Sequence, residues 1–183
     1  MTKHNPPSHE IITELTDAGF TCTTCAACCT GPDALVIVSP SEIRELIQAT
    51  NLLWDEIVIP YPEYIIERKI RLTFGWALRH KKGQCIFLEQ NRCTVYHARP
   101  WICKTYPFML NQEHITPSAC PGLGSKPDSY LINQLARDLI SRQYAEEQEE
   151  AEIAHWYQIF CSTPPDTKAS LIVIDSEGIK PQP

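Results

Sequence analysis

Apolar residues recur at helical spacing near the start of the chain. Residues 8–18 place Ile11 and Leu15 on one side of a helix, where Ser8 can cap the first turn and Gly19 can end the last. A stripe of this kind lets a helix bury one face against the rest of a protein. The pattern therefore predicts a short N-terminal helix over residues 8–18.

Two later segments also favour helices. Ser39 can cap a helix that has Pro40 at its first position, and Glu42 is placed to complete a capping box. Residues 128–160 contain neither Pro nor Gly and repeat large apolar residues at helical spacing. We predict one long helix or two joined helices there, with the glutamate-rich segment Glu146–Glu152 on the solvated face.

Shorter apolar runs bounded by turn residues favour strands. The stretches that fit are 34–38, part of 51–62, 72–78, 84–88, 93–96, 110–116 and 171–174. We expect 84–88 and 93–96 to pair as a hairpin with one cysteine on each arm, and 171–174 to add an edge strand. The pattern thus predicts a small single α+β domain, with a β-hairpin, short helices and a long C-terminal helix.

The composition is that of a globular protein. Of 183 residues, 43% are hydrophobic and 21% are charged, so the chain can bury a core. No window approaches the roughly 18 consecutive apolar residues of a membrane-spanning helix, and Met1–Glu10 lacks the apolar stretch of a secretory signal. The net charge of -6 argues against a general nucleic-acid binder. We expect a cytoplasmic protein without a membrane or nucleic-acid partner.

Nine cysteines give the sequence its candidate chemistry. Structural disulfides are rare in a reducing compartment, so this many thiols indicate metal ligands. They fall into a tight group of four, a spread group of four and one outlier, namely Cys22, Cys25, Cys28 and Cys29, then Cys85, Cys93, Cys103 and Cys120, and finally Cys161.

The cysteine spacing closely resembles that of a known family. The matching motifs are Cys22-x2-Cys25-x2-Cys28-Cys29, Gly83-Gln84-Cys85-Ile86-Phe87-Leu88, Cys93-Thr94-Val95-Tyr96-His97-Ala98-Arg99-Pro100-Trp101-Ile102-Cys103, Tyr106-Pro107-Phe108 and Cys120-Pro121-Gly122. Over residues 20–125 they resemble the YkgJ-type cysteine-cluster family, a zinc- or iron-chelating domain family marked by eight cysteines. This chain has Ala26 where members usually have Gly, and Lys104 where they often have Arg. The resemblance implies a metal or iron–sulfur centre on the first eight cysteines and leaves Cys161 outside it.

Thiolates are soft ligands that suit zinc and iron–sulfur clusters. Eight of them can form two four-ligand sites, which could be two zinc sites, two cubanes or one of each. The spacing of Cys22, Cys25 and Cys28 is typical of a [4Fe-4S] cluster, for which Cys120 before Pro121 is a remote fourth ligand. Zinc sites usually match two Cys-x2-Cys pairs, and no second pair exists here. We predict an iron–sulfur cluster, with zinc as the alternative.

The two adjacent cysteines and the histidines bear on the ligand set. We expect the side chains of Cys28 and Cys29 to diverge, so that they serve different metals or one bridges two. His97 and His114 could bind metal, but with eight thiols available we expect both on the surface or beside the ligands. His155 is expected in the core or on the surface.

Residues around the spread cysteines carry excess positive charge. Between Tyr61 and Lys104, nine Lys or Arg stand against three Glu, and cations lower the pKa of nearby thiols. We expect Arg99 and Lys104 to lie beside the metal ligands, together with Tyr96 and Tyr106 of the family motif. A basic surface for an acidic partner or for RNA is the alternative.

No nucleotide-binding loop, serine triad or paired-carboxylate motif is present, so no catalytic residue is assigned. We predict an electron-transfer or accessory protein that works with an unidentified protein partner. One alternative is a zinc-stabilised structural or interaction module. The other is a metal-dependent enzyme or subunit associated with a modification reaction such as methylation, which is implied by the resemblance of the cluster to that of some flagellin lysine methylases. The expected organisation is an N-terminal helix at 1–19, a cysteine-cluster domain at 20–125, a helical region packed on it at 126–161 and a tail at 162–183.

Overall fold

The computed structural model describes residues 7–31, 34–126, 128–163, 165, 167 and 169–182. Helices and strands occur together, which confirms the predicted α+β class. The described helices are α1 (His9–Ala18), α2 (Pro40–Thr50), α3 (Trp54–Ile57), α4 (Trp101–Thr105) and α5 (Ser129–Ser162), with the 3-10 turns η1 (Ala27–Cys29) and η2 (Tyr96–Ala98).

The strands of the described residues form two sheets and three small hairpins. The larger sheet has the order β13-β12-β4-β3, formed by Gly178–Gln182, Leu171–Asp175, Ile70–Phe74 and Ile65–Glu67. The smaller sheet has the order β1-β5-β2, formed by Ile37–Val38, Trp76–Leu78 and Val58–Pro60. The hairpins are β6 (His80–Lys81) with β7 (Gln84–Cys85), β8 (Leu88–Glu89) with β9 (Arg92–Cys93), and β10 (Phe108–Asn111) with β11 (His114–Pro117).

Local signals in the sequence place the first helices as predicted. The Ser8 hydroxyl accepts a hydrogen bond from the backbone N–H of Ile11, and Gly19 ends α1. The capping box of α2 is complete, because the Ser39 hydroxyl accepts from the Glu42 N–H at 3.2 Å while Glu42 Oε2 accepts from the Ser39 N–H at 2.9 Å. Each cap satisfies N–H groups that a helix start leaves unpaired.

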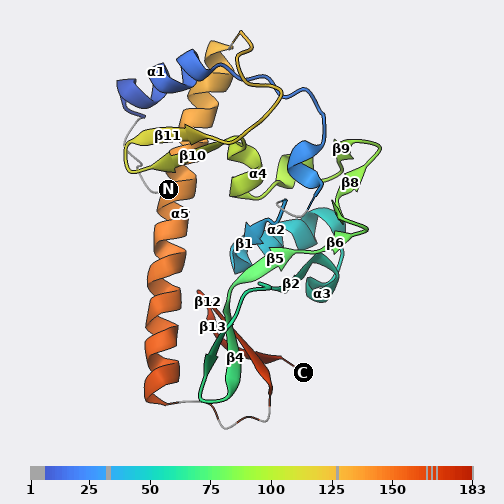
Figure 1. Cartoon of the computed structure of the whole chain (residues 1–183), viewed down its shortest axis with the longest axis vertical. Coiled ribbons are helices and arrows are strands. Elements are labelled where there is room, and N and C mark those ends of the chain that lie inside the picture. The colour runs from blue at the N-terminus through green and yellow to red at the C-terminus, as the bar shows by residue number, and fades with distance from the viewer. Residues whose placement is uncertain are drawn as a thin grey trace.

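The long C-terminal segment forms one helix, α5, which runs along one side of the molecule (Figure 1). Asp128 caps it by accepting from the N–H groups of Tyr130 and Leu131. Four of the five glutamates in Glu146–Glu152 are exposed, as predicted, and Glu149 is half-buried. The first half of α5 packs against α1 and β10, and its last turns pack on β12. No helix among the described residues is long and apolar enough to cross a bilayer.

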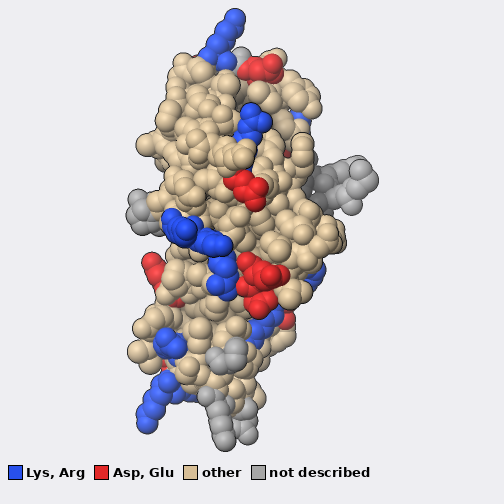
Figure 2. All heavy atoms as spheres, turned by 90° about the vertical axis from the view of Figure 1, so that its right-hand side faces the viewer, with Lys and Arg blue, Asp and Glu red and all other residues tan. Residues whose placement is uncertain are grey.

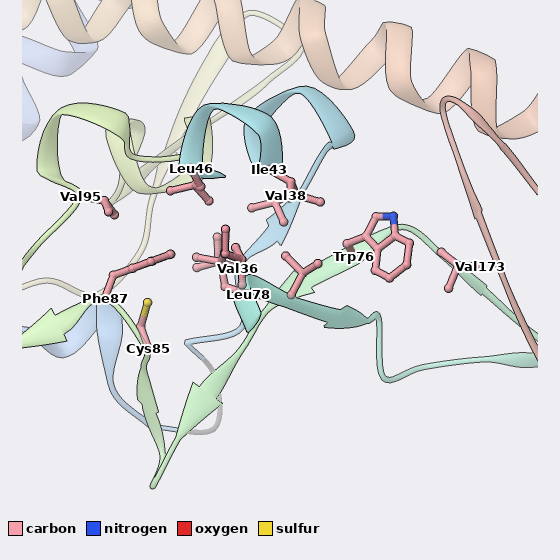
Figure 3. Packing of buried hydrophobic residues seen from close by; sticks show 12 residues of the cluster. Val36, Val38, Ile43, Leu46, Trp76, Leu78, Cys85, Phe87, Val95 and Val173 are labelled. Atoms are coloured by element: carbon pink, nitrogen blue, oxygen red, sulfur yellow. The ribbon is translucent and has the colours of Figure 1, made fainter. Parts of the chain in front are cut away.

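The central core joins the smaller sheet to the cysteine-bearing hairpins (Figure 3). Its buried side chains include Val36, Ile43, Leu46, Leu78, Cys85, Phe87 and Val95. Two other clusters lie against α5, one with Leu15, Phe108 and Ile132 and the other with Leu72, Phe160 and Ile172. Cys85 is therefore fixed by the same packing that fixes the fold.

The strand predicted at 171–174 is present, but its predicted place at the edge of a sheet is wrong. β12 pairs in parallel with β4 and antiparallel with β13, so both of its sides are hydrogen-bonded. The outer strand β13 was missed because Lys180 and Pro181 interrupt its apolar pattern. Burial of Ile172, Val173 and Ile174 fits an interior strand.

The single hairpin predicted across 84–96 is also wrong in detail. Cys85 lies in β7, opposite His80 across the Lys82–Gly83 turn, and Cys93 lies in β9, opposite Leu88. Two short hairpins replace one long hairpin because the chain turns twice, each time through residues with positive φ. Three other runs also differ: 34–38 shortens to β1, 51–62 includes the one-turn helix α3, and 110–116 belongs to the β10–β11 hairpin.

Candidate metal centre

The structure brings the eight predicted ligands to one place. A cavity of about 430 Å³ is lined by cysteines from the loop after α1, from η1, from the β6–β7 and β8–β9 hairpins, from α4 and from the loop before α5. These are Cys22, Cys25, Cys28, Cys29, Cys85, Cys93, Cys103 and Cys120. All nine thiols of the chain are free. The tight group and the spread group thus surround a common space, although up to 98 positions separate their members.

Close backbone contacts join the first cysteine loop to the last. The N–H of Thr21 donates to the carbonyl of Gly122 at 3.1 Å, and Phe20 forms a β-bridge with Leu123. A Cβ at Gly122 would lie 2.2 Å from the carbonyl oxygen of Thr21, so a side chain there cannot be accommodated without movement. This contact sets the Cys22 loop beside the Cys120 loop.

The next cysteines are presented by a tight turn. Ala26 adopts the left-handed conformation with φ 60°, and its carbonyl accepts from the Cys29 N–H at 2.9 Å to close η1. Left-handed geometry explains why glycine is usual at this position in the resembled family. Gly31 donates to the carbonyl of Gly83 at 3.1 Å, which fixes this turn against the hairpin that carries Cys85.

The segment 96–106 closes another side of the cavity. Glu42 accepts from the Trp101 N–H at 2.7 Å through Oε1, so the capping residue of α2 also holds the start of α4. Arg99 donates to the carbonyls of Tyr96 at 3.0 Å and Cys103 at 3.2 Å. Its guanidinium carbon lies 3.7 Å from the centre of the Tyr96 ring. Arg99 therefore braces the segment while lining the cavity.

Burial opposes ionisation of the inner thiols. It raises the pKa of Cys103 to about 12 and also raises the pKa values of Cys85 and Cys93. Desolvation disfavours a thiolate, which is the form that binds metal. Metal binding must therefore displace protons from these thiols, and it compensates for the burial of their charge.

Cys28 and Cys29 behave differently from the other thiols. Their Sγ atoms lie 3.8 Å apart, so the expected divergence of the two side chains is wrong. A 3-10 turn replaces the regular helix or strand on which that expectation rested. A hydrogen bond from Cys29 lowers the pKa of Cys28 to about 6, and the Arg99 charge lowers it further, whereas the pKa of Cys29 is raised by the same contact. The pair can present one thiolate near neutral pH.

The remaining candidates lie in several places. Tyr96 and Tyr106 line the cavity with Arg99, and the Tyr106 hydroxyl donates to the carbonyl of Ala119 at 2.8 Å, next to Cys120. Lys104 does not line it, and its ammonium lies 4.6 Å from the centre of the Trp101 ring. The roles predicted for these residues beside the ligands stay predictions.

The histidines named as candidates do not line the cavity. His97 and His155 are exposed, and His114 at the start of β11 pairs with Glu14 of α1 at 2.8 Å. Cys161 lies outside the cavity, half-buried and packed near Leu72 and Phe160 at the end of α5.

Two residues at or near the cavity were missed from the sequence. Arg92 lines it, and His80 lies across the β6–β7 ladder from Cys85 with a buried Nε2 that has no hydrogen-bond partner among the described residues. The turn at Lys82–Gly83 could have placed His80 opposite Cys85, because directly opposed residues share a face of a hairpin.

The charge excess around the spread cysteines does not form a separate basic patch on the face shown in Figure 2. Several Lys and Arg side chains there form a short run at mid-height that adjoins Asp or Glu side chains, and the others lie apart. At the cavity itself, Arg92 and Arg99 are the two cationic residues among the described lining. They are the cations placed to offset negative thiolates.

A family model named CxxCxxCC, described as "Putative zinc- or iron-chelating domain", matches residues 21–121, more than half of the chain. The chain belongs to the CxxCxxCC family. No solved structure matches it. The match spans every cysteine that lines the cavity, and thiolates are fitting ligands for both metals in the family description. CxxCxxCC membership thus supports metal binding by this domain.

Proposed function

We propose that the protein carries an iron–sulfur centre in the cysteine cavity and serves in electron transfer or as an accessory protein in the maturation of a partner. The proposal rests above all on the convergence of eight thiols on one cavity of about 430 Å³. An iron–sulfur centre supplies one-electron transfer, with a potential set by surrounding charge and hydrogen bonds. The chain's own part is to hold the thiolates and place Arg99 beside them.

The spacing of the sulfurs supports a centre with several metal atoms. Thiolates on one tetrahedral zinc lie about 3.8 Å from each other, given zinc–sulfur bonds of about 2.3 Å. Among the described residues, no three cysteine sulfurs lie within 4.8 Å of one another. A cluster binds its cysteines through different metal atoms, so it spans wider separations between sulfurs. The cavity matches that requirement better than it matches two compact zinc tetrahedra.

Purification without oxygen tests the proposal. We expect brown protein with broad visible absorption, iron by metal analysis and sulfide released by acid. Cys103→Ser should lose part of this signal, and Cys161→Ser is the matched control because its thiol lies outside the cavity. A colourless preparation that contains zinc and no iron would contradict the proposal.

Zinc is the second candidate, and one distance favours it. The 3.8 Å separation of the Cys28 and Cys29 sulfurs is the value expected for two ligands of one zinc. In that case the protein is a zinc-stabilised module whose surface binds a partner protein. Spectroscopy of cobalt-substituted protein distinguishes a zinc site from an iron–sulfur centre. A tetrahedral thiolate site that binds zinc also takes up cobalt in the same number of ions per chain and then absorbs intensely in the visible range.

A further inference from the structure

A second cavity adjoins the cysteine cavity. It has a volume of about 380 Å³ and shares Cys28, Cys103 and Tyr106 with the first, so these three residues form the wall between the two. The rest of its lining is largely apolar and includes Leu35, Val36, Ile102, Phe108 and Met109. Small-molecule sites in proteins occupy roughly 300–1,000 Å³ and are mostly apolar with a few polar groups. The second cavity has these properties.

Its charged group is a buried arginine. Arg142, in the middle of α5, is only 7% exposed and lines the cavity. Its Nη1 donates to the Thr105 hydroxyl at 3.0 Å and its Nε to Glu146 at 2.7 Å. A guanidinium has five N–H donors, so these two bonds leave donors available to a ligand.

The balancing charge lies on the other side of the guanidinium. The side chain of Glu146 is 59% exposed and does not line the second cavity. Among the described residues of the lining there is no Asp, Glu or Lys, and Arg142 is its single charged side chain. Glu146 already pairs with this charge at the helix surface, and the described lining holds no acidic side chain that would repel an anion from the remaining guanidinium donors. The cavity can therefore accept an anion on Arg142.

We propose that the second cavity binds a small organic carboxylate, with its carboxylate on Arg142 and its apolar part against Phe108 and Ile102. A planar guanidinium matches a carboxylate through two parallel hydrogen bonds. Inorganic phosphate fits less well, because a doubly charged anion would meet one cation and a largely apolar lining. The ligand would lie against Cys28 and Cys103. Its use as a substrate at the metal centre rests on the proposed function, but its binding does not.

Binding of benzoate, measured by calorimetry on the purified full chain, tests this site. Benzyl alcohol is the matched neutral probe because it keeps the ring and lacks the charge. We expect benzoate to bind at least tenfold more tightly, as expected for a charge-assisted hydrogen bond. Arg142→Gln should remove that preference. Arg137→Gln, an exposed arginine on the same helix, should leave it unchanged.

A second variant keeps the test decisive if Arg142→Gln fails to fold. Ala34 is half-exposed and lines the second cavity but not the first. Ala34→Phe should fill the space and abolish benzoate binding while metal content stays constant. Equal binding of the two probes, or benzoate affinity unchanged in Ala34→Phe, would overturn the proposal. Metal analysis of every sample keeps this result separate from the identity of the metal centre.

Discussion

The Sγ atoms of Cys28 and Cys29 lie 3.8 Å apart, and the hydrogen bond between them separates the pKa values of two neighbouring thiols. Cys29 stays protonated and donates, so Cys28 becomes a thiolate at lower pH than an ordinary cysteine. In the metal-free protein, Cys28 should react with iodoacetamide with a half-maximal rate near pH 6, since its pKa is about 6. Cys103, with a pKa of about 12, should stay unreactive at neutral pH. Mass spectrometry of alkylated peptides gives both profiles.

The same pKa shift affects the stability of the metal-free protein. Because folding lowers the pKa of Cys28, the thiolate stabilises the folded state above the ordinary value of 9.0, and this contribution disappears as the pH falls through about 6. Cys29→Ala removes the donor and should move the reactivity of Cys28 towards pH 9. A Cys28 profile that stays at pH 6 in this variant would rule out the hydrogen bond as the cause.

The contact between Gly122 and Thr21 predicts that replacing Gly122 is more costly than replacing a glycine with open space around it. Gly122→Ala puts a Cβ 2.2 Å from a backbone oxygen, so the loops of Cys22 and Cys120 must move apart. We expect a loss of about 2 kcal/mol in the free energy of unfolding, as for other overpacked sites, together with reduced metal content.

Gly124 provides the control for this substitution. It has φ +74°, and a Cβ there would meet nothing within 4 Å, so Gly124→Ala costs only the left-handed conformation, about 1–2 kcal/mol. Denaturant unfolding gives both free energies, and metal analysis separates the variants further. Full metal content in Gly122→Ala would show that the contact between Thr21 and Gly122 does not position the ligands.

Ala26 lies in the left-handed region with φ 60°, which predicts an unusual response to glycine. Ala26→Gly relieves about 1–2 kcal/mol of conformational strain but loses a buried methyl group worth about 0.8 kcal/mol. The free energy of unfolding should therefore change by less than about 1 kcal/mol. Ala77→Gly, at a fully buried strand position without such strain, should be clearly destabilising. Equal losses in the two variants would contradict this account.

The sequence predicts those features of the fold and of the site that depend on residues close together in the chain. Ser39, Pro40 and Glu42 fix the start of α2 within four residues, and the cysteine motifs identify the family. The second bond of Glu42, to the Trp101 N–H, spans 59 positions and has no local signal. Arg142 is another case, because a charged residue in a polar helix indicates a solvated face, whereas tertiary packing buries it. Contacts between remote segments are decided by the whole fold.

The odd cysteine provides a test of the ligand set. Cys161 is half-buried near Phe160, away from the cavity. Cys161→Ser should keep full metal stoichiometry and lose about 1 kcal/mol of stability at most, since a small apolar group is exchanged for a polar one of similar size. Cys25→Ser and Cys103→Ser should each lose metal. If metal analysis showed a loss in Cys161→Ser, the ligand set would have to include that thiol.

Metal removal should destabilise the chain unevenly. The thiols come from residues 22 to 120, so metal binding ties together segments far apart in the sequence, and its free energy is partly folding free energy. The cluster around Leu72, Phe160 and Ile172 does not line the cavity and buries its own apolar core.

Hydrogen exchange after chelation measures how much order each segment loses when the metal is removed. We expect amides of 20–31 and 118–125 to lose protection, because their order depends on the bound thiolates. Amides of β12 (Leu171–Asp175), hydrogen-bonded on both sides and buried, should keep theirs. The melting temperature should fall by several degrees, since each 1 kcal/mol corresponds to about 2–4 °C in a chain of this size. Uniform protection before and after chelation, with an unchanged melting temperature, would show that the cysteine segments are ordered without metal.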